Sequence, residues 1–451
     1  MKPFFLILSV VVFGMNPRRP GAADEPRHHS RGTNTVAITS ALIDSFMEEV
    51  RTNSPSLRAA NSRASAAEAN LGSVRTWEDP VFLFGGSVFS SSGFDPAQQG
   101  DLAYGIEQKL PLWNTPKLNR RSAEAALSVR RAEMDYRVEE LRRDITKTLL
   151  AAALAERLVE IGEEDQAWLE ITARAVESKY RTGEAVVADT LQVQNELAER
   201  RDRLRTDHLK ADHSLLSLNR LLNRQFTTSW PSFQLPAVAP PVPYSAKLVS
   251  AALQSEPKLK VMAQEIKQAE ATATLARQSR LPEVSLGIEG RQYSRDGGFR
   301  EGDFTVRFSL PWGNSGKYRK DYEREKEKQK SAEQEREDQE LTVREELHHI
   351  TVDLDAARRE ALIYTGEISV RALQALSSRL ADWESGRGTL RDVMDARRSA
   401  LEAQLMAVRA TAEQGGMLAD LLLLAGLPNL EALAPLENEP AIVSHDESEK
   451  K

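Results

Sequence analysis

The sequence predicts a mainly helical protein with membrane-spanning β-strands, built from two tandem repeats that each contain a long coiled-coil helical hairpin and two strands. Three observations lead to this fold class. Short segments recur about 200 residues apart, long charged stretches lack proline, and four short segments alternate between apolar and polar residues. Recurrence indicates duplication, proline-free stretches favour long helices, and alternation is typical of strands with two different faces.

The duplication is clearest at two places. Residues 55–57 (Pro-Ser-Leu) return 202 residues later as 257–259 (Pro-Lys-Leu), and residues 110–113 (Leu-Pro-Leu-Trp) return as 310–312 (Leu-Pro-Trp). A period of this length is far too long for a solenoid unit. The two copies are therefore predicted to be two domains of the same plan.

Each repeat is expected to contain a short helix, a medium helix, two strands and two long antiparallel helices. In repeat 1, residues 41–51 and 57–75 are predicted to be helical. Residues 116–180 contain no further proline and only one glycine, Gly162, so they can form one helix of roughly 95 Å at 1.5 Å per residue. Residues 185–223 form the return helix, with apolar residues in the 4-3 spacing of a coiled coil.

The second repeat follows the same plan, with long helices predicted at 317–384 and 389–425. Gly415-Gly416 interrupts the last of these, and no glycine pair occupies the corresponding place in repeat 1. Glycine is a weak helix former. The pair therefore predicts either a kink or bulge, or the region where the helix bends.

Strands are expected at about 81–90, 101–110, 283–292 and 303–310. Each has the length that a tilted strand needs to cross the hydrocarbon of a bilayer. In the last three, one face is apolar and the other carries charges such as Glu107 and Arg307, whereas the first strand is apolar on both faces. The predicted lipid-facing residues are Leu102, Tyr104, Ile106, Val284, Leu286, Ile288, Phe304, Val306 and Phe308.

Tryptophans flank these strands at one end. Trp77, Trp113 and Trp312 predict an interfacial aromatic belt. Four strands cannot close a membrane barrel, which needs about eight, and open strand edges are not tolerated in lipid. Several chains must then share one barrel. The alternative is a soluble sheet formed by the same hairpins.

The N-terminus has the pattern of an export signal, in which Lys2 precedes an apolar run at 4–13 and small residues follow up to Ala23. Cleavage there removes three basic residues and moves the net charge from −7 to −10. The resulting organisation is a signal peptide at 1–23, a flexible mature N-terminus at 24–37, repeat 1 at 38–230, a Pro-rich extended linker at 231–243, repeat 2 at 244–428 and a flexible acidic tail at 429–451.

Composition and motifs exclude several function classes. An acidic chain is a poor partner for nucleic acid, and the absence of cysteine excludes disulfides, thiolate metal sites and a lipidated N-terminal cysteine. Nucleophile-elbow, phosphate-loop and zinc-protease motifs are missing. His348 and His349 are adjacent, so on a helix their side chains diverge by about 100° and chelate a metal poorly. We predict no enzyme, no cofactor and no metal site.

The duplicated plan, the two strand exits and the segment 386–396 (Gly-x-Gly-Thr-Leu-Arg-Asp-Val-Met-Asp-Ala) resemble the TolC-like outer-membrane efflux proteins over residues 39–427. The resemblance implies a homotrimer whose chains form a 12-stranded β-barrel in the bacterial outer membrane, continued by an α-helical tunnel through the periplasm. It also implies a passive export duct that a periplasmic adaptor protein couples to an inner-membrane pump. The hairpin tips that contact the adaptor match Gly183, Gly386, Gly388 and Thr389.

In such channels acidic residues line a constriction at the tips, and the matching residues here are Asp392 and Asp395. Three copies would present two rings of carboxylates, which concentrate cations. The alternative is that both residues simply occupy the first turns of a helix, where acidic residues are favoured.

The resemblance is closest to the heavy-metal cation branch, with a pump of the resistance-nodulation-division type, on residues 55–60 (Pro-Ser-Leu-Arg-Ala-Ala) and 78–80 (Glu-Asp-Pro). One alternative within the family is the outer-membrane component of a type I protein secretion system. An alternative of another class is a periplasmic coiled-coil adaptor protein. Adaptors contain one hairpin, whereas hairpins and strand pairs each occur twice here.

Overall fold

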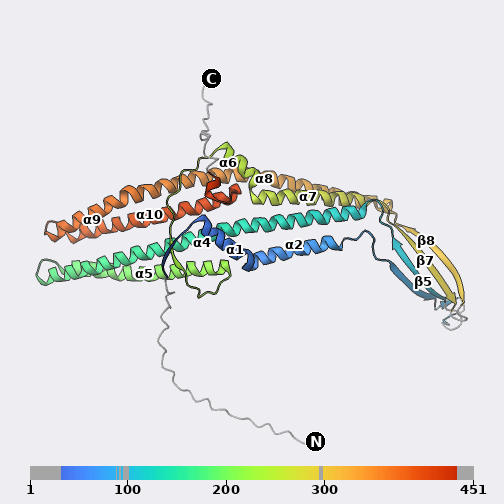
Figure 1. Cartoon of the computed structure of the whole chain (residues 1–451), viewed down its shortest axis with the longest axis horizontal. Coiled ribbons are helices and arrows are strands. Elements are labelled where there is room, and N and C mark those ends of the chain that lie inside the picture. Colours follow the sequence, from blue (N-terminus) through green and yellow to red (C-terminus); the bar gives the residue numbers. More distant parts are fainter. Residues whose placement is uncertain (1–31, 88, 91–92, 95–100, 294–297, 434–451) are drawn as a thin grey trace, which may run out of the picture.

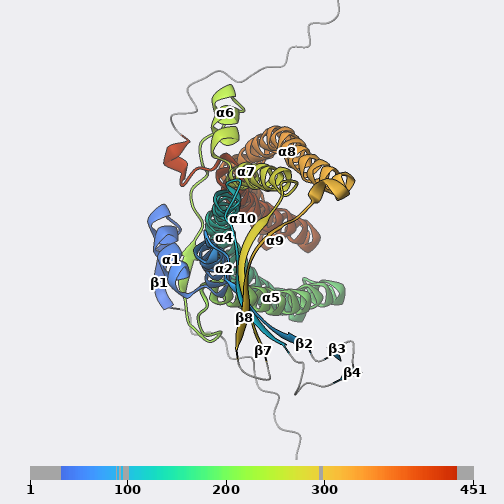
Figure 2. The same cartoon turned by 90° about the vertical axis from the view of Figure 1, so that its right-hand side faces the viewer.

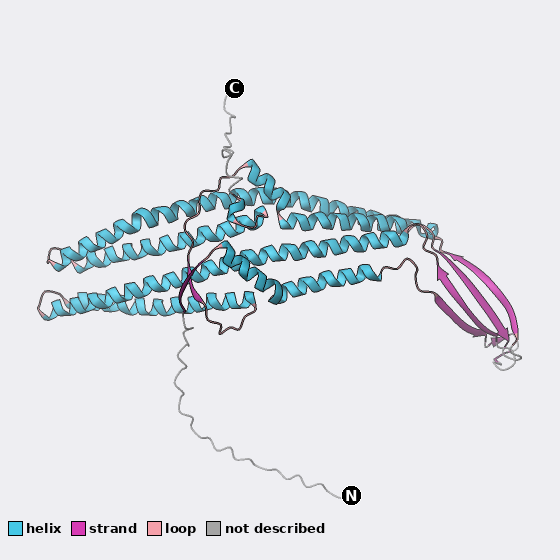
Figure 3. Cartoon of the chain, in the orientation of Figure 1, coloured by secondary structure: helices cyan, strands magenta, loops and turns pink. Residues whose placement is uncertain are grey.

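The computed structural model describes residues 32–87, 89–90, 93–94, 101–293 and 298–433. The predicted signal peptide therefore lies outside the described residues, as does most of the predicted C-terminal tail. The molecule is elongated, with the tips of two helical hairpins at one end and a sheet at the other (Figure 1). The main sheet lies beyond the helices along the long axis, whereas one short strand pair lies beside the helices in the middle of the molecule (Figure 3).

Repeat 1 follows the predicted plan. The short helices are α1 (Ser40–Asn53) and α2 (Pro55–Ser73), the strands β2 (Val81–Ser87) and β5 (Asp101–Lys109), and the long helices α4 (Thr115–Arg181) and α5 (Val187–Leu222). A short hairpin of two-residue strands, β3 (Phe89–Ser90) and β4 (Gly93–Phe94), lies between β2 and β5. The predicted single helix between 116 and 180 is present as one α-helix of 67 residues. It has proline only in its first turn, where the missing N–H costs nothing.

Repeat 2 contains α6 (Ala246–Ser255), α7 (Pro257–Gln278), β7 (Val284–Tyr293), β8 (Phe299–Phe308), η1 (Pro311–Asn314), α8 (Ser315–Ile363), η2 (Tyr364–Ile368), α9 (Ser369–Glu384), α10 (Leu390–Ala425) and η3 (Leu430–Ala432). The structure differs from the prediction in the third long helix. The π-helix η2 separates α8 from α9, where the sequence predicted one continuous helix. A π-turn accommodates an extra residue in a helix, and its hydrogen-bond pattern leaves no mark in hydrophobic periodicity.

The predicted kink at Gly415-Gly416 is absent, because α10 continues through both residues as regular α-helix. Gly415 instead allows close packing. A Cβ atom there would lie 3.0 Å and 3.1 Å from the two Cδ atoms of Leu150 on α4, whereas a Cβ on Gly416 would meet nothing within 4 Å.

The structure also differs from the predicted linker and flexible N-terminus. Residues of the linker form β6 (Pro231–Gln234), which pairs in parallel with β1 (Gly32–Ala37). Buried Glu156 holds β6 against α4, because its carboxylate accepts hydrogen bonds from the backbone N–H of Phe233 at 2.9 Å and from the Ser232 hydroxyl at 2.8 Å. At the other terminus, Leu433 is buried, so the first residues of the predicted tail belong to the folded part.

The helices form one curved layer that both repeats share. Towards the sheet, the neighbours run in the order α2, α4, α7, α8; towards the tips, they run α5, α4, α10, α9. Seen end-on, these helices lie along an open arc (Figure 2). The long helix α4 therefore links the repeats, because it packs against both α7 and α10 of repeat 2.

The main sheet repeats this arrangement, with strand order β2-β5-β7-β8 and antiparallel pairing throughout. The repeats meet at the β5–β7 pair, and β2 and β8 are the outermost strands. None of the described helices is both long enough and apolar enough to cross a membrane.

Candidate functional site: the sheet and the hairpin tips

One face of the sheet carries rows of exposed apolar side chains. The register aligns Phe82, Ile106, Ile288 and Phe304 across all four strands, and each is between 50% and 68% exposed. Because side chains alternate along a strand, a single register places a whole set on one side. All nine residues that the sequence predicted to face lipid share this face, and only Val284 and Leu286 among them are half-buried.

The opposite face is polar. The Arg307 guanidinium pairs with the Glu107 carboxylate and, at 3.3 Å, with the Glu289 carboxylate. The Ser285 hydroxyl also donates to Glu107. The pairing of Val81 with Glu107 sets the face of the first strand, which sequence alone left undecided, and places Phe82 and Phe84 on the apolar side.

The three predicted belt tryptophans lie where the sheet meets the helices. Trp77, Trp113 and Trp312 are all exposed. The indole Nε1 of Trp113 donates to the carbonyl oxygen of Pro282 at 2.7 Å, and this bond joins the end of β5 to the segment before β7. Each tryptophan thus flanks a strand at the helical end of the sheet.

The two hairpin tips are turns that depend on glycine. Gly183 and Gly386 adopt positive φ angles of 81° and 76°, a region that residues with a Cβ rarely occupy. Gly388 packs closely against the preceding turn, since a Cβ on it would lie 3.2 Å from the Cβ of Asp382. The structure also joins the tips directly: Lys179 Nζ donates to the Trp383 carbonyl at 3.1 Å and lies 4.6 Å from the centre of its ring. Sequence patterns gave no sign of this contact.

Asp392 and Asp395 both begin α10 beside the second tip. Asp392 and Thr389 form a capping box, in which the carboxylate accepts from the Thr389 hydroxyl at 2.7 Å and backbone N–H at 3.3 Å. These hydrogen bonds hold the pKa of Asp392 below its usual range. Asp395 is exposed and pairs with Arg398 at 3.4 Å. Asp392 therefore has a structural role at this helix start, besides any role that its charge has in an assembled channel.

A buried cluster of charges joins the two hairpins further from the tips, and sequence reasoning did not predict it. Arg397 on α10 makes two hydrogen bonds of 2.8 Å to the Asp165 carboxylate on α4, and a 3.2 Å bond to Glu196 on α5. Burial opposes ionisation of Glu196, but hydrogen bonds from Arg398 and Arg397 lower its pKa overall. The three helices are thus connected through one arginine.

A second arginine explains the only glycine within α4. The Arg200 Nε donates to the Gly162 carbonyl at 3.2 Å, and a Cβ at Gly162 would lie 1.9 Å from its Nη2. Burial lowers the pKa of Arg200, while Asp165 at 3.5 Å favours its charged form. A lone glycine in the interior of a long helix was the only sequence signal that pointed to this buried site.

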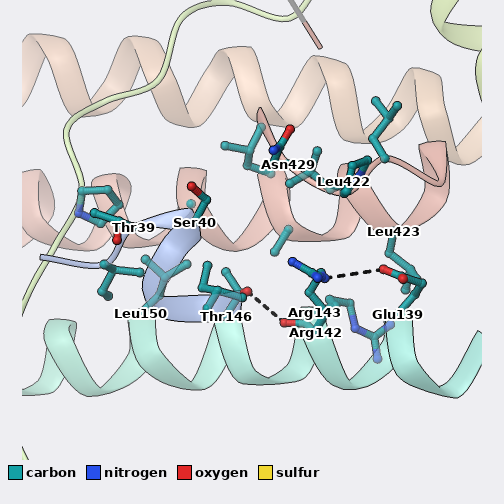
Figure 4. A pocket seen from close by; sticks show the side chains of 18 of the residues that line it. Thr39, Ser40, Glu139, Arg142, Arg143, Thr146, Leu150, Leu422, Leu423 and Asn429 are labelled. Atoms are coloured by element: carbon teal, nitrogen blue, oxygen red, sulfur yellow. Dashed lines mark hydrogen bonds and ion pairs between the residues drawn. The ribbon is translucent and has the colours of Figure 1, made fainter. Parts of the chain in front are cut away.

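A mainly apolar pocket of about 290 Å³ lies between α1, α4 and α10 (Figure 4). Leu150, Leu422 and Leu423 line it, and Arg142 at its edge pairs with Asp44 at 2.6 Å. Within the described ranges, no group of three or more His, Asp or Glu side chains is arranged to hold a metal ion.

Comparisons with known proteins agree with this geometry. The family model described as "Outer membrane efflux protein" matches residues 46–224 and 248–427, one match in each repeat. No curated protein matches the chain. The fold is similar to those of VceC from Vibrio cholerae (16% identity, TM-score 0.72, 86% of this chain and 96% of that chain) and the CmeC outer membrane channel of Campylobacter jejuni (14%, 0.73, 92% and 94%). It is also similar to the open state of the MtrE outer membrane channel of Neisseria gonorrhoeae (18%, 0.69, 86% and 89%).

These findings confirm the predicted fold class, the outer-membrane location and the prediction of an efflux channel rather than an enzyme. The match extends over both repeats, each with its helical hairpin and its strand pair. The chain belongs to the outer membrane efflux protein family.

Proposed function

We propose that three copies of the chain join side by side into a closed channel, in which their sheets form a 12-stranded barrel and their helices a periplasmic tunnel. The observation that carries this proposal is the single open layer. One edge of this layer is formed by β2, α2 and α5. The opposite edge is formed by β8, α8 and α9. Two different edges that meet head to tail generate a ring when the rotation closes.

Apolar residues on the outermost helices support such contacts. Exposed large apolar side chains occur on α5 at Leu191 and Leu209, and along the opposite edge at Leu362, Ile363 and Leu373. An isolated soluble chain rarely leaves such sets in water. Contact between copies would bury them.

We propose further that the tips around Gly183 and Gly386–Thr389 contact a periplasmic adaptor protein, and that Asp392 and Asp395 form carboxylate rings at the constriction. The chain has no catalytic machinery in its sequence, so the energy for export comes from an inner-membrane pump. We assign the pump to the resistance-nodulation-division type and the cargo to heavy-metal cations, on the sequence segments 55–60 and 78–80. Deletion of the gene should then increase sensitivity to metal cations more than to organic drugs; the reverse result contradicts the cargo assignment.

The assembly is tested with the full chain expressed with its signal peptide. We expect outer-membrane fractionation, a heat-dependent change in gel mobility, a native mass of three chains in detergent and conductance in planar bilayers. A monomer recovered from the soluble periplasm without conductance contradicts the proposal.

A further inference from the structure

We propose that the helical end of the sheet carries a basic collar that binds the headgroups of anionic phospholipids. The basic collar consists of the four segments that adjoin the main strands at this end: residues 74–80, 109–121, 277–283 and 309–320. The inference rests on the proposed insertion of the sheet into a bilayer. It adds the chemical class of lipid that the chain selects.

Topology places the four segments together. They precede β2, follow β5, precede β7 and follow β8, so the antiparallel strands bring all of them to one end. The same end carries Trp77, Trp113 and Trp312, the residues expected at a membrane interface. Figure 1 shows this end, where α2, α4, α7 and α8 run up to the sheet.

The charge of the collar is opposite to that of the whole chain. The four segments contain ten basic and three acidic residues, a net charge of +7, whereas the complete sequence has a net charge of −7. Two of the three acidic residues, Glu78 and Glu283, form ion pairs with Lys109, whose Nζ lies 3.0 Å from a carboxylate oxygen of each. Three other basic residues of the collar pair with glutamates one turn outside its bounds, so the uncompensated positive charge at this end comes from the remaining basic residues.

Much of this charge has no protein partner. Arg75, Lys117, Arg121, Arg277 and Arg280 are all exposed, and none forms an ion pair within 4.0 Å in the described part of the chain. By contrast, many charged residues on the long helices pair with neighbours one turn away, as Arg181 does with Glu177 at 2.6 Å. Unpaired arginine and lysine side chains can extend to a headgroup while their stems contact apolar surface.

The basic positions also recur between the repeats. Arg75 corresponds to Arg277 at the repeat spacing of 202, and Lys117 corresponds to Lys317 at a spacing of 200. The segments before β2 and β7 and the segments after β5 and β8 therefore each carry a basic residue at a matching position. In a ring of three chains this pattern would surround the barrel.

The ligand to which this geometry points is a phosphate diester on a lipid in the leaflet that faces the helices. Anionic lipids attract basic residues near a bilayer surface, and the effect is worth about fivefold in affinity for each residue. Lipopolysaccharide phosphates belong to the opposite leaflet, so they should not compete efficiently. Free inorganic phosphate lacks the acyl chains that the apolar face and the tryptophans would contact.

The test uses the full chain reconstituted in phosphatidylcholine vesicles that contain brominated phosphatidylglycerol or brominated phosphatidylcholine. Brominated acyl chains quench nearby tryptophans. Trp77, Trp113 and Trp312 lie beside the sheet, whereas the other three of the six tryptophans lie on helices or at β6 and provide a constant background. We expect brominated phosphatidylglycerol to quench at a mole fraction at least about fivefold lower than brominated phosphatidylcholine.

The variant replaces Arg75, Lys117, Arg277 and Lys317 with glutamine. Its preference for phosphatidylglycerol over phosphatidylcholine should fall to a ratio of about one. The matched control replaces four exposed basic residues far from the sheet, none with an ion pair in the described ranges: Arg205, Lys210, Lys260 and Arg344. The control should keep the preference of the unmodified chain.

The outcomes separate the collar from the proposed membrane insertion. Strong quenching by both lipids with no preference for phosphatidylglycerol overturns the collar alone, as does equal loss in the variant and the control. Displacement by lipid A or by inorganic phosphate at constant ionic strength assigns the site to a different phosphate source and also overturns it. Absence of quenching by either lipid overturns insertion of the sheet together with the collar.

Discussion

Arg397 shows how a single buried charge joins parts of the chain that are distant in sequence. Its side chain and that of Asp165 are each less than a tenth exposed, and the guanidinium also reaches Glu196. Removing Arg397 leaves buried Asp165 with only the longer contact of 3.5 Å to Arg200, and the loss of one partner from a buried pair costs more than the pair contributes. The neighbouring Arg398 pairs with Asp395 and also with Glu196, but its side chain is half exposed and therefore screened by solvent, and Glu196 keeps its bond to Arg397 when Arg398 is removed.

We therefore predict that Arg397→Ala lowers the free energy of unfolding by about 3–5 kcal/mol. The matched variant Arg398→Ala should lower it by about 1 kcal/mol or less. Urea unfolding in detergent, followed by circular dichroism, measures both. A loss for Arg397→Ala no larger than that for Arg398→Ala would show that the buried cluster does not stabilise the hairpins.

Asp392 and Asp395 can be tested as gate residues without loss of the helix cap. Thr389 is the N-cap, and an asparagine at 392 keeps a side-chain oxygen that can accept from the Thr389 N–H, so Asp392→Asn with Asp395→Asn removes charge and keeps the capping box. We expect the double variant to reduce the block of single-channel current by trivalent cations. The double variant Asp202→Asn with Asp338→Asn, at two exposed positions, serves as the control. If the gate variant is blocked as strongly as the unmodified chain, neither Asp392 nor Asp395 lines the constriction.

The pH dependence of this block follows from the cap. Hydrogen bonds from Thr389 lower the pKa of Asp392, so its carboxylate stays ionised where an ordinary aspartate, with a pKa of 3.8, becomes protonated. We expect part of the block to persist below about pH 4, where an ordinary aspartate becomes mostly protonated. In Thr389→Val, which loses the hydroxyl bond, the block should decline at a higher pH than in the unmodified chain. Coincident profiles would contradict the argument.

At the scale of elements, the contact between α10 and α4 depends on one of two adjacent glycines. A Cβ on Gly415 would lie 3.0 Å and 3.1 Å from the Cδ atoms of Leu150, so a larger side chain there forces Leu150 to move, while Gly416 faces open space. We predict that Gly415→Val destabilises the protein by about 1–3 kcal/mol through overpacking. Gly416→Ala should stabilise it by about 1 kcal/mol, because alanine is the better helix former. Thermal unfolding of the two variants checks both signs, and equal effects would show that the packing argument is wrong.

The start of α7 predicts a pH-dependent stability. Glu256 caps this helix by accepting from the Leu259 N–H, yet it is buried, and burial raises its pKa above 4.5 despite the opposing backbone hydrogen bonds. The folded state then binds a proton more tightly than the unfolded state. Its contribution to stability is greatest below pH 4.5 and is lost as the pH rises through the folded pKa.

Glu256→Gln keeps an acceptor oxygen for the cap and removes the buried charge. We expect the variant to be more stable than the unmodified chain at pH 7, with the difference closing by about pH 4. Chemical unfolding over this pH range measures it. Repeat 1 has Ser54, an uncharged residue, at the corresponding place, and Glu256→Ser should flatten the pH profile in the same way. A profile parallel to that of the unmodified chain would contradict the assignment.

At the scale of the whole molecule, the apolar face of the sheet should determine assembly. Val306 lies on this face and is half exposed, while its neighbour Thr305 points to the polar face. We predict that Val306→Lys costs about 2–4 kcal/mol near the bilayer midplane and reduces the yield of assembled channel. Thr305→Lys, one residue away, should assemble normally. Heat-modified gel mobility distinguishes the two variants, and equal assembly would indicate that this face does not contact lipid.

Local patterns in the sequence determined much of this protein. Alternation determined the faces of three strands and the nine apolar positions, the absence of proline determined the single long helix α4 of 67 residues, and duplication determined the two-repeat plan. These properties depend on residues that are neighbours along the chain, where periodicity and backbone preference act directly.

Only the tertiary structure decided how those elements meet. The Arg397–Asp165 pair joins residues 232 positions apart, and the Lys179–Trp383 contact joins residues 204 positions apart. The parallel pairing of β1 with β6 and the true function of Gly415 likewise depend on elements distant in sequence. Such contacts follow from the packing of complete helices and from the free-energy cost of leaving buried polar groups unpaired. Local sequence patterns predict neither of these.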